Sequence, residues 1–165
     1  MPEPPAIIVR PVRRNDLEAL VRLCADHAVF ERSEYDPAGA AERLAGLLFG
    51  PEPRLHCLVA ERDGRPVGYA SWSIEVSTWE ASLHAHMDGL YLDEDVRGAG
   101  VGRRLMARLT RDARAAGCRE VQWQTPAFNA RAMDFYERLG PSREEKVRYT
   151  LDGAAFDRLA ADGSD

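Results

Sequence analysis

The chain carries a glycine-rich segment, Arg97-Gly98-Ala99-Gly100-Val101-Gly102, between an apolar strand-like run and a helix-like run. Glycines let backbone amides approach a ligand without a Cβ in the way, and the first turn of a helix offers unpaired N–H groups with a partial positive charge. A strand, a glycine loop and a helix in this order therefore predict an anion cradle within a mixed α and β fold. Phosphate is the expected ligand.

Two common phosphate-binding motifs do not fit this segment. A P-loop needs four residues between its glycines and then Gly-Lys-Ser/Thr, whereas the single residue Val101 separates Gly100 from Gly102 and two arginines follow. The dinucleotide fingerprint G-x-G-x-x-G fails because the glycines alternate and because no acidic residue closes a strand about twenty residues later. The pattern that remains is R-x-x-G-x-G.

Two blocks of the sequence together resemble a known enzyme family. Residues 97–102 match the Q/R-x-x-G-x-G/A signature of the Gcn5-related N-acetyltransferases, and residues 129–140 are similar to that family's N-x-x-A-x-x-F-Y-x-x-x-G segment. The resemblance implies a single domain over residues 1–165 with the family's α+β fold. In this α/β/α layered fold a mixed, mostly antiparallel sheet of about six to seven strands is flanked by four helices.

The resemblance also implies acetyl-coenzyme A (acetyl-CoA) as the cosubstrate, with its pyrophosphate at the glycine loop, and no metal. Tyr136 matches the residue that donates to the departing thiolate, although it could simply pack beside Phe135 on a helix. Asn129 matches a cofactor contact and could also cap its helix. The expected cofactor contacts are Leu90, Tyr91, Leu92, Arg97, Gly98, Ala99, Gly100, Val101, Gly102, Arg103, Asn129, Ala132 and Phe135.

Hydrophobic periodicity predicts the element order β, α, α, β, β, β, α, β, α, β. The predicted strands cover residues 7–10, 55–61, 66–76, 83–92, 121–124 and 147–151, with Asp63-Gly64 as a hairpin turn. The predicted helices start at Asn15 as an N-cap with Glu18 at N3, at Asp36-Pro37, after the glycine loop and at Asn129. Residues 160–165 resemble a disordered tail.

Composition fits one enzyme domain in the cytoplasm. A chain of 165 residues buries roughly 70% of its unfolded surface, and a net charge of −5 argues against nucleic acid or an anionic membrane as the main partner. Cys24, Cys57 and Cys118 follow no disulfide or zinc pattern, and residues 1–9 are too short and proline-rich for a signal peptide. We expect a cytoplasmic homodimer with a small-molecule substrate.

The strand before the glycine loop places His84, His86 and Asp88 at every second position, hence on one face. Asp88 is a candidate for the base that deprotonates an acceptor amine or for the anchor of its ammonium group, and a histidine relay is a further option. A solvated strand face would explain the same alternation, so both interpretations stay open. Gly89 suggests a β-bulge, which in the resembling family frees the amides after it to polarise the thioester carbonyl.

Within the family, the nearest resemblance is to the diamine and polyamine N-acetyltransferases. It rests on residues 30–36, 56–61 and 77–80. It implies an acidic and aromatic approach for a cationic amine, formed by Glu31, Glu34, Asp36 and Trp79. An ordinary solvated loop explains the acidic residues equally well. That branch tends to carry two adjacent acids where this chain has Asp88-Gly89, so the sequence predicts an amine acceptor without naming it.

Three functions remain open from the sequence. The first is an acetyl-CoA-dependent N-acetyltransferase whose acceptor, a small cationic diamine, polyamine or lysine-like compound, attacks directly through its primary amine in a ternary complex. The second acetylates protein or peptide amines, against which the acidic loop and Trp79 argue mildly because they would crowd an open groove. The third is a non-catalytic acyl-CoA-binding sensor, which would need neither Tyr136 nor the complete glycine loop.

Overall fold

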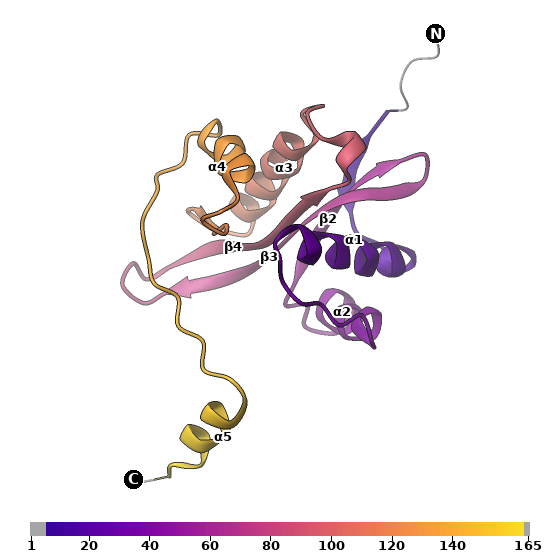
Figure 1. The fold of residues 1–165 in the computed structure, drawn as a ribbon. Coiled ribbons are helices and arrows are strands. Elements are labelled where there is room, and N and C mark those ends of the chain that lie inside the picture. The colour runs from indigo at the N-terminus through magenta and orange to yellow at the C-terminus, as the bar shows by residue number, and fades with distance from the viewer. Residues whose placement is uncertain (1–5, 164–165) are drawn as a thin grey trace.

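A five-stranded sheet separates two layers of helices in the computed structural model, which describes residues 6–163 (Figure 1). Consecutive strands are neighbours, and all pairs are antiparallel except β4 with β5, which is parallel. The strands are β1 (Ile8–Pro11), β2 (His56–Arg62), β3 (Arg65–Ser77), β4 (Ser82–Leu92) and β5 (Val121–Gln122). These are the first five strands that the sequence predicts, and the last of them is shorter than expected.

The turn between β2 and β3 forms where the sequence predicts it. Asp63 has a φ of 51° and Gly64 a φ of 77°. Both central residues therefore lie in the left-handed region that a two-residue type I′ hairpin turn requires. The turn fixes the register in which Arg62 pairs with Arg65.

Helices α1 (Leu17–Phe30) and α2 (Ala40–Phe49) cover one face of the sheet. Leu20 and Leu23 of α1 are three residues apart, so they point to the same side of the helix and are buried with Leu48 of α2. Burial of each leucine side chain contributes about 1.5–3 kcal/mol. This packing holds the last turns of α1 against β3 and β4.

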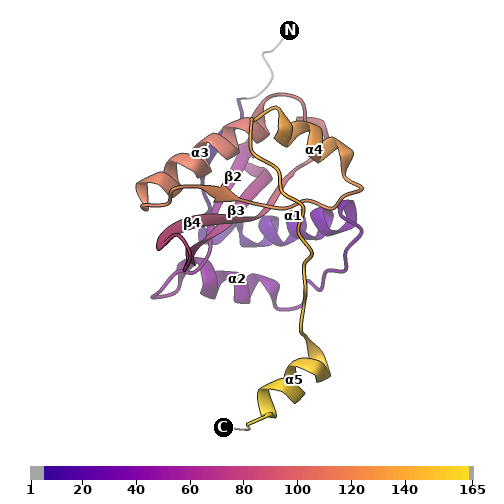
Figure 2. The same cartoon turned by 90° about the vertical axis from the view of Figure 1, so that its left-hand side faces the viewer.

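Helix α3 (Val101–Ala115) covers the opposite face, with α4 (Ala130–Glu137) beside it (Figure 2). Leu105 and Leu109 of α3 are fully buried and belong to the core on this side, while the exposed side of the helix carries arginines. This amphipathic pattern directs α3 back over the sheet immediately after the glycine loop. The loop consequently lies at the end of β4.

The start of α1 differs from the prediction. Asn15 lies in a short 3-10 turn, η1 (Arg14–Asp16), and does not cap the helix. The Asp16 carboxylate instead binds the Arg10 guanidinium, with 2.7 Å from Nη1 to Oδ2, and accepts the Arg13 amide at 2.7 Å. The ion pair with β1 thus fixes the turn that contains Asn15, and the helix begins two residues after Asn15.

The start of α2 also differs from the prediction. Its N-cap is Gly39, with a φ of 65°, so Asp36 and Pro37 lie in the turn that precedes the helix. In that turn the Asp36 carboxylate accepts the Ala38 amide at 2.9 Å. Asp36 therefore has a structural partner of its own.

The C-terminal part departs furthest from the prediction. Residues 147–151 are extended but form no strand, and Val147 and Tyr149 are exposed. Gly140, with a φ of 81°, and Pro141 lead the chain away from the sheet, and an alternating pattern alone cannot supply a partner strand.

A fifth helix that the sequence did not predict, α5 (Gly153–Ala161), lies beyond this segment, away from the body of the molecule (Figures 1 and 2). Residues 160 and 161 thus end a helix where a disordered tail was expected, and residues 164 and 165 lie outside the described part. Residues 6–163 therefore hold five strands and five α-helices instead of about six to seven and four, within the expected α+β layered fold. Of their helices, none is both long and apolar enough to cross a membrane.

Candidate functional site

The glycine loop follows β4 and a second 3-10 turn, η2 (Glu94–Val96), and leads directly into α3. Gly98 and Gly100 have φ values of 82° and 75°, and nothing lies within 4 Å of where their Cβ atoms would stand. Left-handed backbone costs other residues about 1–2 kcal/mol, so the conformation requires glycine. The first amides of α3, from Val101 onward, have no acceptor within the helix. The exposed loop therefore offers free backbone donors, and the binding of an anion there stays a prediction.

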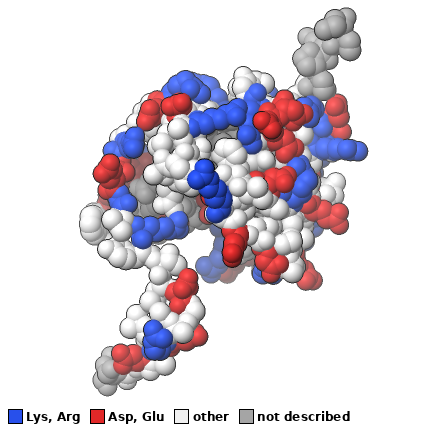
Figure 3. Space-filling model, in the orientation of Figure 1, with Lys and Arg blue, Asp and Glu red and all other residues white. Residues whose placement is uncertain are grey.

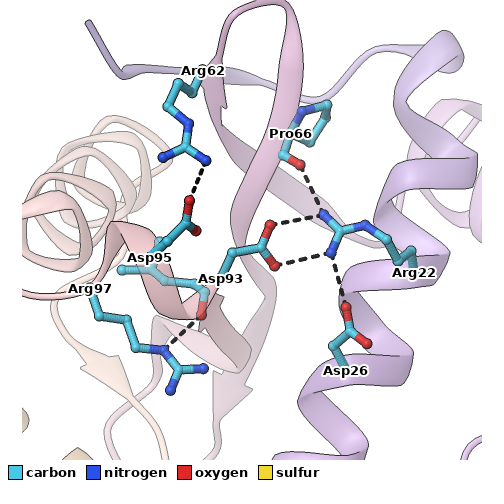
Figure 4. Close-up of polar contacts among 8 residues, drawn as sticks. Arg22, Asp26, Arg62, Pro66, Asp93, Asp95 and Arg97 are labelled. Atoms are coloured by element: carbon cyan, nitrogen blue, oxygen red, sulfur yellow. Dashed lines mark hydrogen bonds and ion pairs between the residues drawn. The ribbon is translucent and has the colours of Figure 1, made fainter. Parts of the chain in front are cut away.

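The side chain of Arg97 turns back toward the body of the protein. Its Nε donates to the Leu92 carbonyl at 2.8 Å, as Figure 4 shows. Its guanidinium lies over the rings of Phe30 and Tyr91, with 4.9 Å and 5.3 Å to the ring centroids. Arg97, expected from the motif as a cofactor contact, thus also joins the loop to β4 and to the end of α1.

Helices α3 and α4 approach each other next to the loop. A Cβ on Gly102 would lie 3.1 Å from Cζ of Phe135 and 3.7 Å from Cδ1 of Leu92, so the glycine allows three elements to meet. Asn129 is buried, and its Oδ1 accepts the Ala132 amide at 3.1 Å, which caps α4. The capping role of Asn129 is confirmed, while its contact with a cofactor stays a prediction.

Strand β4 is open on the β5 side over its second half. Among the described residues, β4 pairs with β5 only through Ala85 and His86. On its other side the register with β3 shifts between Met87 and Gly89, which makes Asp88 the bulged residue, next to the Gly89 from which the bulge was predicted. The backbone groups beyond the bulge, around Leu90 and Tyr91, therefore have no β5 partner.

Tyr136 on α4 lies close to this opening. It is half-buried, and its ring packs at a tilted angle against those of Trp123 and Phe135, with 5.2 Å between centroids in each pair. It belongs to the cluster that contains Leu90. Burial, with a smaller contribution from the charge of Glu31, raises the pKa of Tyr136 to about 12. The hydroxyl therefore keeps its proton at neutral pH and can act as a hydrogen-bond donor.

The predicted acceptor residues are only partly brought together. Glu31 ends α1 and is half-buried near Tyr136, whereas Glu34 and Asp36 are exposed in the loop toward α2. Trp79 is 98% exposed in the turn between β3 and β4. Asp88 lies six residues into β4, about 20 Å from the start of that strand, so the structure does not bring Trp79 to Asp88.

The histidines of β4 lie on the side of the bulge that leads to the hairpin turn. His84 Nε2 lies 3.7 Å from Glu75 Oε2 on β3, which gives this histidine a partner along the hairpin. Within residues 6–163 there is no group of three or more His, Cys, Asp or Glu side chains that could hold a metal ion. The histidine relay on β4 remains a prediction without a contact to support it.

Sequence reasoning missed a polar cluster between α1 and the sheet. His27 Nδ1 lies 2.8 Å from the Tyr69 hydroxyl, and His27 Nε2 lies 3.3 Å from Glu31 Oε1. The His27 ring also stacks on Tyr91, with 5.4 Å between centroids. The i, i+4 spacing of His27 and Glu31 was visible in the sequence, but the contact with Tyr69 crosses 42 residues and was not.

Two arginines brace the segment that leads into the glycine loop (Figure 4). Arg22 of α1 makes paired bonds to Asp93 at 3.0 Å and 3.1 Å and also binds Asp26, while Arg62 of β2 binds Asp95 at 2.5 Å. A cavity of about 670 Å³ lies beside them, lined by further ion pairs such as Arg10 with Glu61. These contacts tie α1 and the segment before the loop to the same end of the sheet.

The surface seen in Figure 3 carries acidic and basic side chains side by side. Arginines and carboxylates alternate over the body and over α5 without gathering into one broad patch on this face. Small sites, rather than a large charged surface, therefore have to account for recognition on this side of the molecule.

The family model of the acetyltransferase (GNAT) family matches residues 19–140, which include the loop, the bulge and Tyr136. The chain is 29% identical over 142 residues to the thialysine N-epsilon-acetyltransferase of Bos taurus, covering 81% of this chain and 83% of that protein. It is 27% identical over 149 residues to the D-amino-acid N-acetyltransferase HPA3 of Saccharomyces cerevisiae, covering 89% and 91%.

A solved structure of the aminoglycoside N-acetyltransferase AAC(6')-Iy in complex with CoA superposes with a TM-score of 0.75. It shares 21% sequence identity and covers 92% of this chain and 98% of that one. The fold is therefore the same, and the motifs that carry the family signature surround the opening at β4. This chain is an N-acetyltransferase of the acetyltransferase (GNAT) family.

Proposed function

We propose that the protein transfers the acetyl group of acetyl-CoA to the primary amine of a small cationic acceptor. One observation supports this proposal most strongly. The start of α3, the end of β4 and α4 meet where Gly102, Leu92 and Phe135 are in contact. An anion held at the loop would thus lie beside the opened strand and Tyr136. The matching relatives are named for acetyl transfer to small amines.

The glycine loop would hold the cosubstrate. Gly98 and Gly100 leave open space beside the loop, and the first amides of α3 can bind pyrophosphate oxygens. When bound, acetyl-CoA supplies an activated acetyl thioester. The amides near Leu90 and Tyr91, on the part of β4 without a β5 partner, are the proposed donors to its carbonyl oxygen.

The acceptor must lose a proton before it can attack. An amine with a pKa of about 10.4 needs about 4.6 kcal/mol for deprotonation at pH 7. Asp88 on the bulge is exposed and is the proposed anchor for the ammonium group. Glu31, Glu34 and Asp36 would make the approach acidic, which favours a cation over a neutral or anionic acceptor.

Tyr136 would donate a hydrogen bond to the sulfur as the thiolate leaves. Its pKa of about 12 lies well above that of a thiol, about 8.5, so complete proton transfer would cost roughly 5 kcal/mol. A hydrogen bond that strengthens in the transition state avoids this cost. The tyrosine therefore acts as a donor and keeps its proton.

We further propose that the enzyme works in the cytoplasm as a homodimer. Cys24, Cys57 and Cys118 are unpaired, which suits a reducing compartment. Exposed apolar side chains in the C-terminal segment, among them Val147 and Tyr149, favour contact with a second copy.

The decisive experiment is a screen of acceptors in which acetyl-CoA is present and free thiol is detected. We expect thiol release to require a small cationic amine and the acetylated amine to appear in equal amount. Release only with peptides would show a protein acetyltransferase instead. Tight binding of CoA with no release in any mixture would show a sensor.

A further inference from the structure

A chain of three polar side chains connects the bulge of β4 to the surface at the end of α1. Tyr69 of β3 is 2.8 Å from His27 Nδ1, and His27 Nε2 is 3.3 Å from Glu31 Oε1. The side chain of His27 is 14% exposed and that of Glu31 is 31% exposed. The chain thus runs from a buried hydroxyl through a nearly buried imidazole to a carboxylate that reaches solvent.

The chemistry of the end groups assigns the direction of the hydrogen bonds. An ionised carboxylate only accepts, so His27 Nε2–H donates to Glu31. His27 Nδ1 then carries the lone pair and accepts the hydroxyl proton of Tyr69. The order hydroxyl, imidazole, carboxylate is one in which an imidazole can take a proton from a hydroxyl and be stabilised by the carboxylate behind it.

The charged and titratable groups around His27 leave it neutral at pH 7. Burial lowers the pKa of His27, and Arg97 lowers it slightly, while Glu31 and Asp88 oppose the shift without cancelling it. Tyr69 and Tyr91 face the ring from β3 and β4, and burial raises the pKa of both hydroxyls, which stay protonated. The other titratable groups that act on Tyr69 are Asp88 and two thiols, Cys24 and Cys57, and burial raises the pKa of both thiols.

The hydroxyl end of the chain touches the bulge itself. A Cβ on Gly89 would lie 2.8 Å from the Tyr69 hydroxyl oxygen, so the absence of a side chain there makes room for this hydroxyl. The adjacent residue, Asp88, is close enough that its charge acts on the pKa values of Tyr69, His27 and Cys24. An ammonium group anchored at Asp88 would therefore lie near the Tyr69 hydroxyl.

We propose that Tyr69, His27 and Glu31 form the path by which the acceptor ammonium loses its proton. This inference rests on the proposed function and on Asp88 as the ammonium anchor. Tyr69 takes the proton, directly or through one water, as its own hydroxyl proton passes to His27 Nδ1. The resulting imidazolium is held by Glu31, which returns the proton to solvent.

The protons and electrons balance over the whole reaction. The ammonium R–NH₃⁺ gives one proton to the Tyr69–His27 path, and the free amine attacks the thioester carbon, forming the C–N bond. The C–S bond breaks, and its electron pair leaves with sulfur. The second proton lost by nitrogen goes to the thiolate, near Tyr136. The products are the amide, the free thiol and one proton in solution.

The test compares two acceptors in three variants. Tyr69→Phe removes only the hydroxyl, His27→Gln keeps a polar group without the imidazole, and Glu31→Gln removes the carboxylate charge at the half-exposed end. One acceptor is an alkylamine that is protonated at pH 7, and the other is an analogue whose amine is already neutral there. Tyr149→Phe, at an exposed tyrosine, and His56→Gln, at a histidine stacked on Trp72, are matched controls.

We expect Tyr69→Phe and His27→Gln to lower kcat/KM for the alkylamine about 100-fold at pH 7, the lower end of the usual effect of general base catalysis. Most of this loss should be recovered at alkaline pH, where the amine deprotonates in solution. The neutral acceptor should change less than about threefold, and Glu31→Gln should show the same pattern more weakly. CoA affinity, measured by calorimetry, should stay at the wild-type value.

Equal losses on both acceptors would overturn the path and show that the three residues only support the fold. Wild-type kinetics with the alkylamine in Tyr69→Phe or Glu31→Gln would overturn it as well. If His27→Gln does not fold, these two variants still decide the question. A wild-type protein that acetylates no small amine would instead reject the proposed function.

Discussion

The two halves of the site are built in different ways. The proposed cofactor half, residues 97–103 with α4, lies on two stretches of chain and offers mainly backbone amides. The proposed acceptor half, which comprises His27, residues 31–36, Tyr69 and Asp88, collects side chains from α1, β3 and β4. The cofactor half is therefore fixed by local conformation, whereas the acceptor half depends on long-range packing and on charge.

The largest effect is expected from Tyr136→Phe, where the two halves meet. Loss of one transition-state donor is worth about 2.7–4 kcal/mol, so kcat should fall about 100- to 1,000-fold. CoA affinity should be unchanged because the ring and its contacts with Trp123 and Phe135 remain. Single-turnover kinetics measure the chemical step directly. Unaltered turnover there would remove Tyr136 from the mechanism.

Substitution at Gly100 tests whether the cofactor half is set by backbone conformation. Gly100→Ala forces a side chain into left-handed backbone at a cost of about 1–2 kcal/mol, so CoA affinity should fall roughly 5- to 30-fold. Gly64→Ala is the matched control, because Gly64 has a φ of 77° and an equally open surrounding in the β2–β3 turn. Both variants should lose similar thermal stability. Calorimetry that finds equal CoA affinity in both would place the pyrophosphate elsewhere.

Asp88→Asn tests whether the acceptor half depends on charge. A hydrogen bond to a charged group contributes about 1.5–3 kcal/mol, so KM for a cationic amine should rise at least about tenfold. A neutral acceptor should lose much less, and CoA affinity should not change. Steady-state kinetics with both acceptors measure the difference. A wild-type KM for the cation would mean that another carboxylate anchors the acceptor.

Acid should loosen the acceptor half before the cofactor half. In the folded protein Arg10 holds the pKa of Asp16 below its usual value, so the stability from this ion pair is present above about pH 3.9 and is lost as pH falls through the folded pKa. The pKa of His27 is also lowered, so the unfolded chain binds this proton more readily, and stability falls as pH drops below about 6.5.

Amide hydrogen exchange measured between pH 7 and pH 4 checks this order. Protection of α1 should decrease first, while α3, which packs through Leu105 and Leu109, should keep its protection. The effect should be smaller in His27→Gln, which no longer titrates at this position, and Asp16→Asn should reduce only the further loss below about pH 4. Simultaneous loss of protection in both helices would mean that the two halves unfold as one unit.

The same contrast explains what could be predicted from the sequence. The strand–glycine loop–helix order, the bulge next to Gly89 and the Asn129 cap depend on neighbouring residues, and the structure confirms all three, while the anion at the loop stays a prediction. The cap of α1 was predicted wrongly because Asn15 lies within the 3-10 turn before the helix, where the Asp16 carboxylate binds Arg10 of β1 and the Arg13 amide. The contact of His27 with Tyr69 depends on the packing of a helix on a strand far away in the sequence. Local patterns carry no information on such pairs.

The extended segment after Gly140 also determines how the protein can be handled. Residues 141–152 have few backbone partners, and their side chains are exposed, so a protease can bind this stretch in the extended form that cleavage requires. A single cut there would separate α5 from the rest while leaving the loop, the bulge and Tyr136 on one fragment. A cut before Tyr149 thus offers a trimmed enzyme that lacks the exposed side chains of Tyr149 and Leu159. With those apolar groups gone, the trimmed form should remain dispersed at concentrations where the whole chain begins to associate.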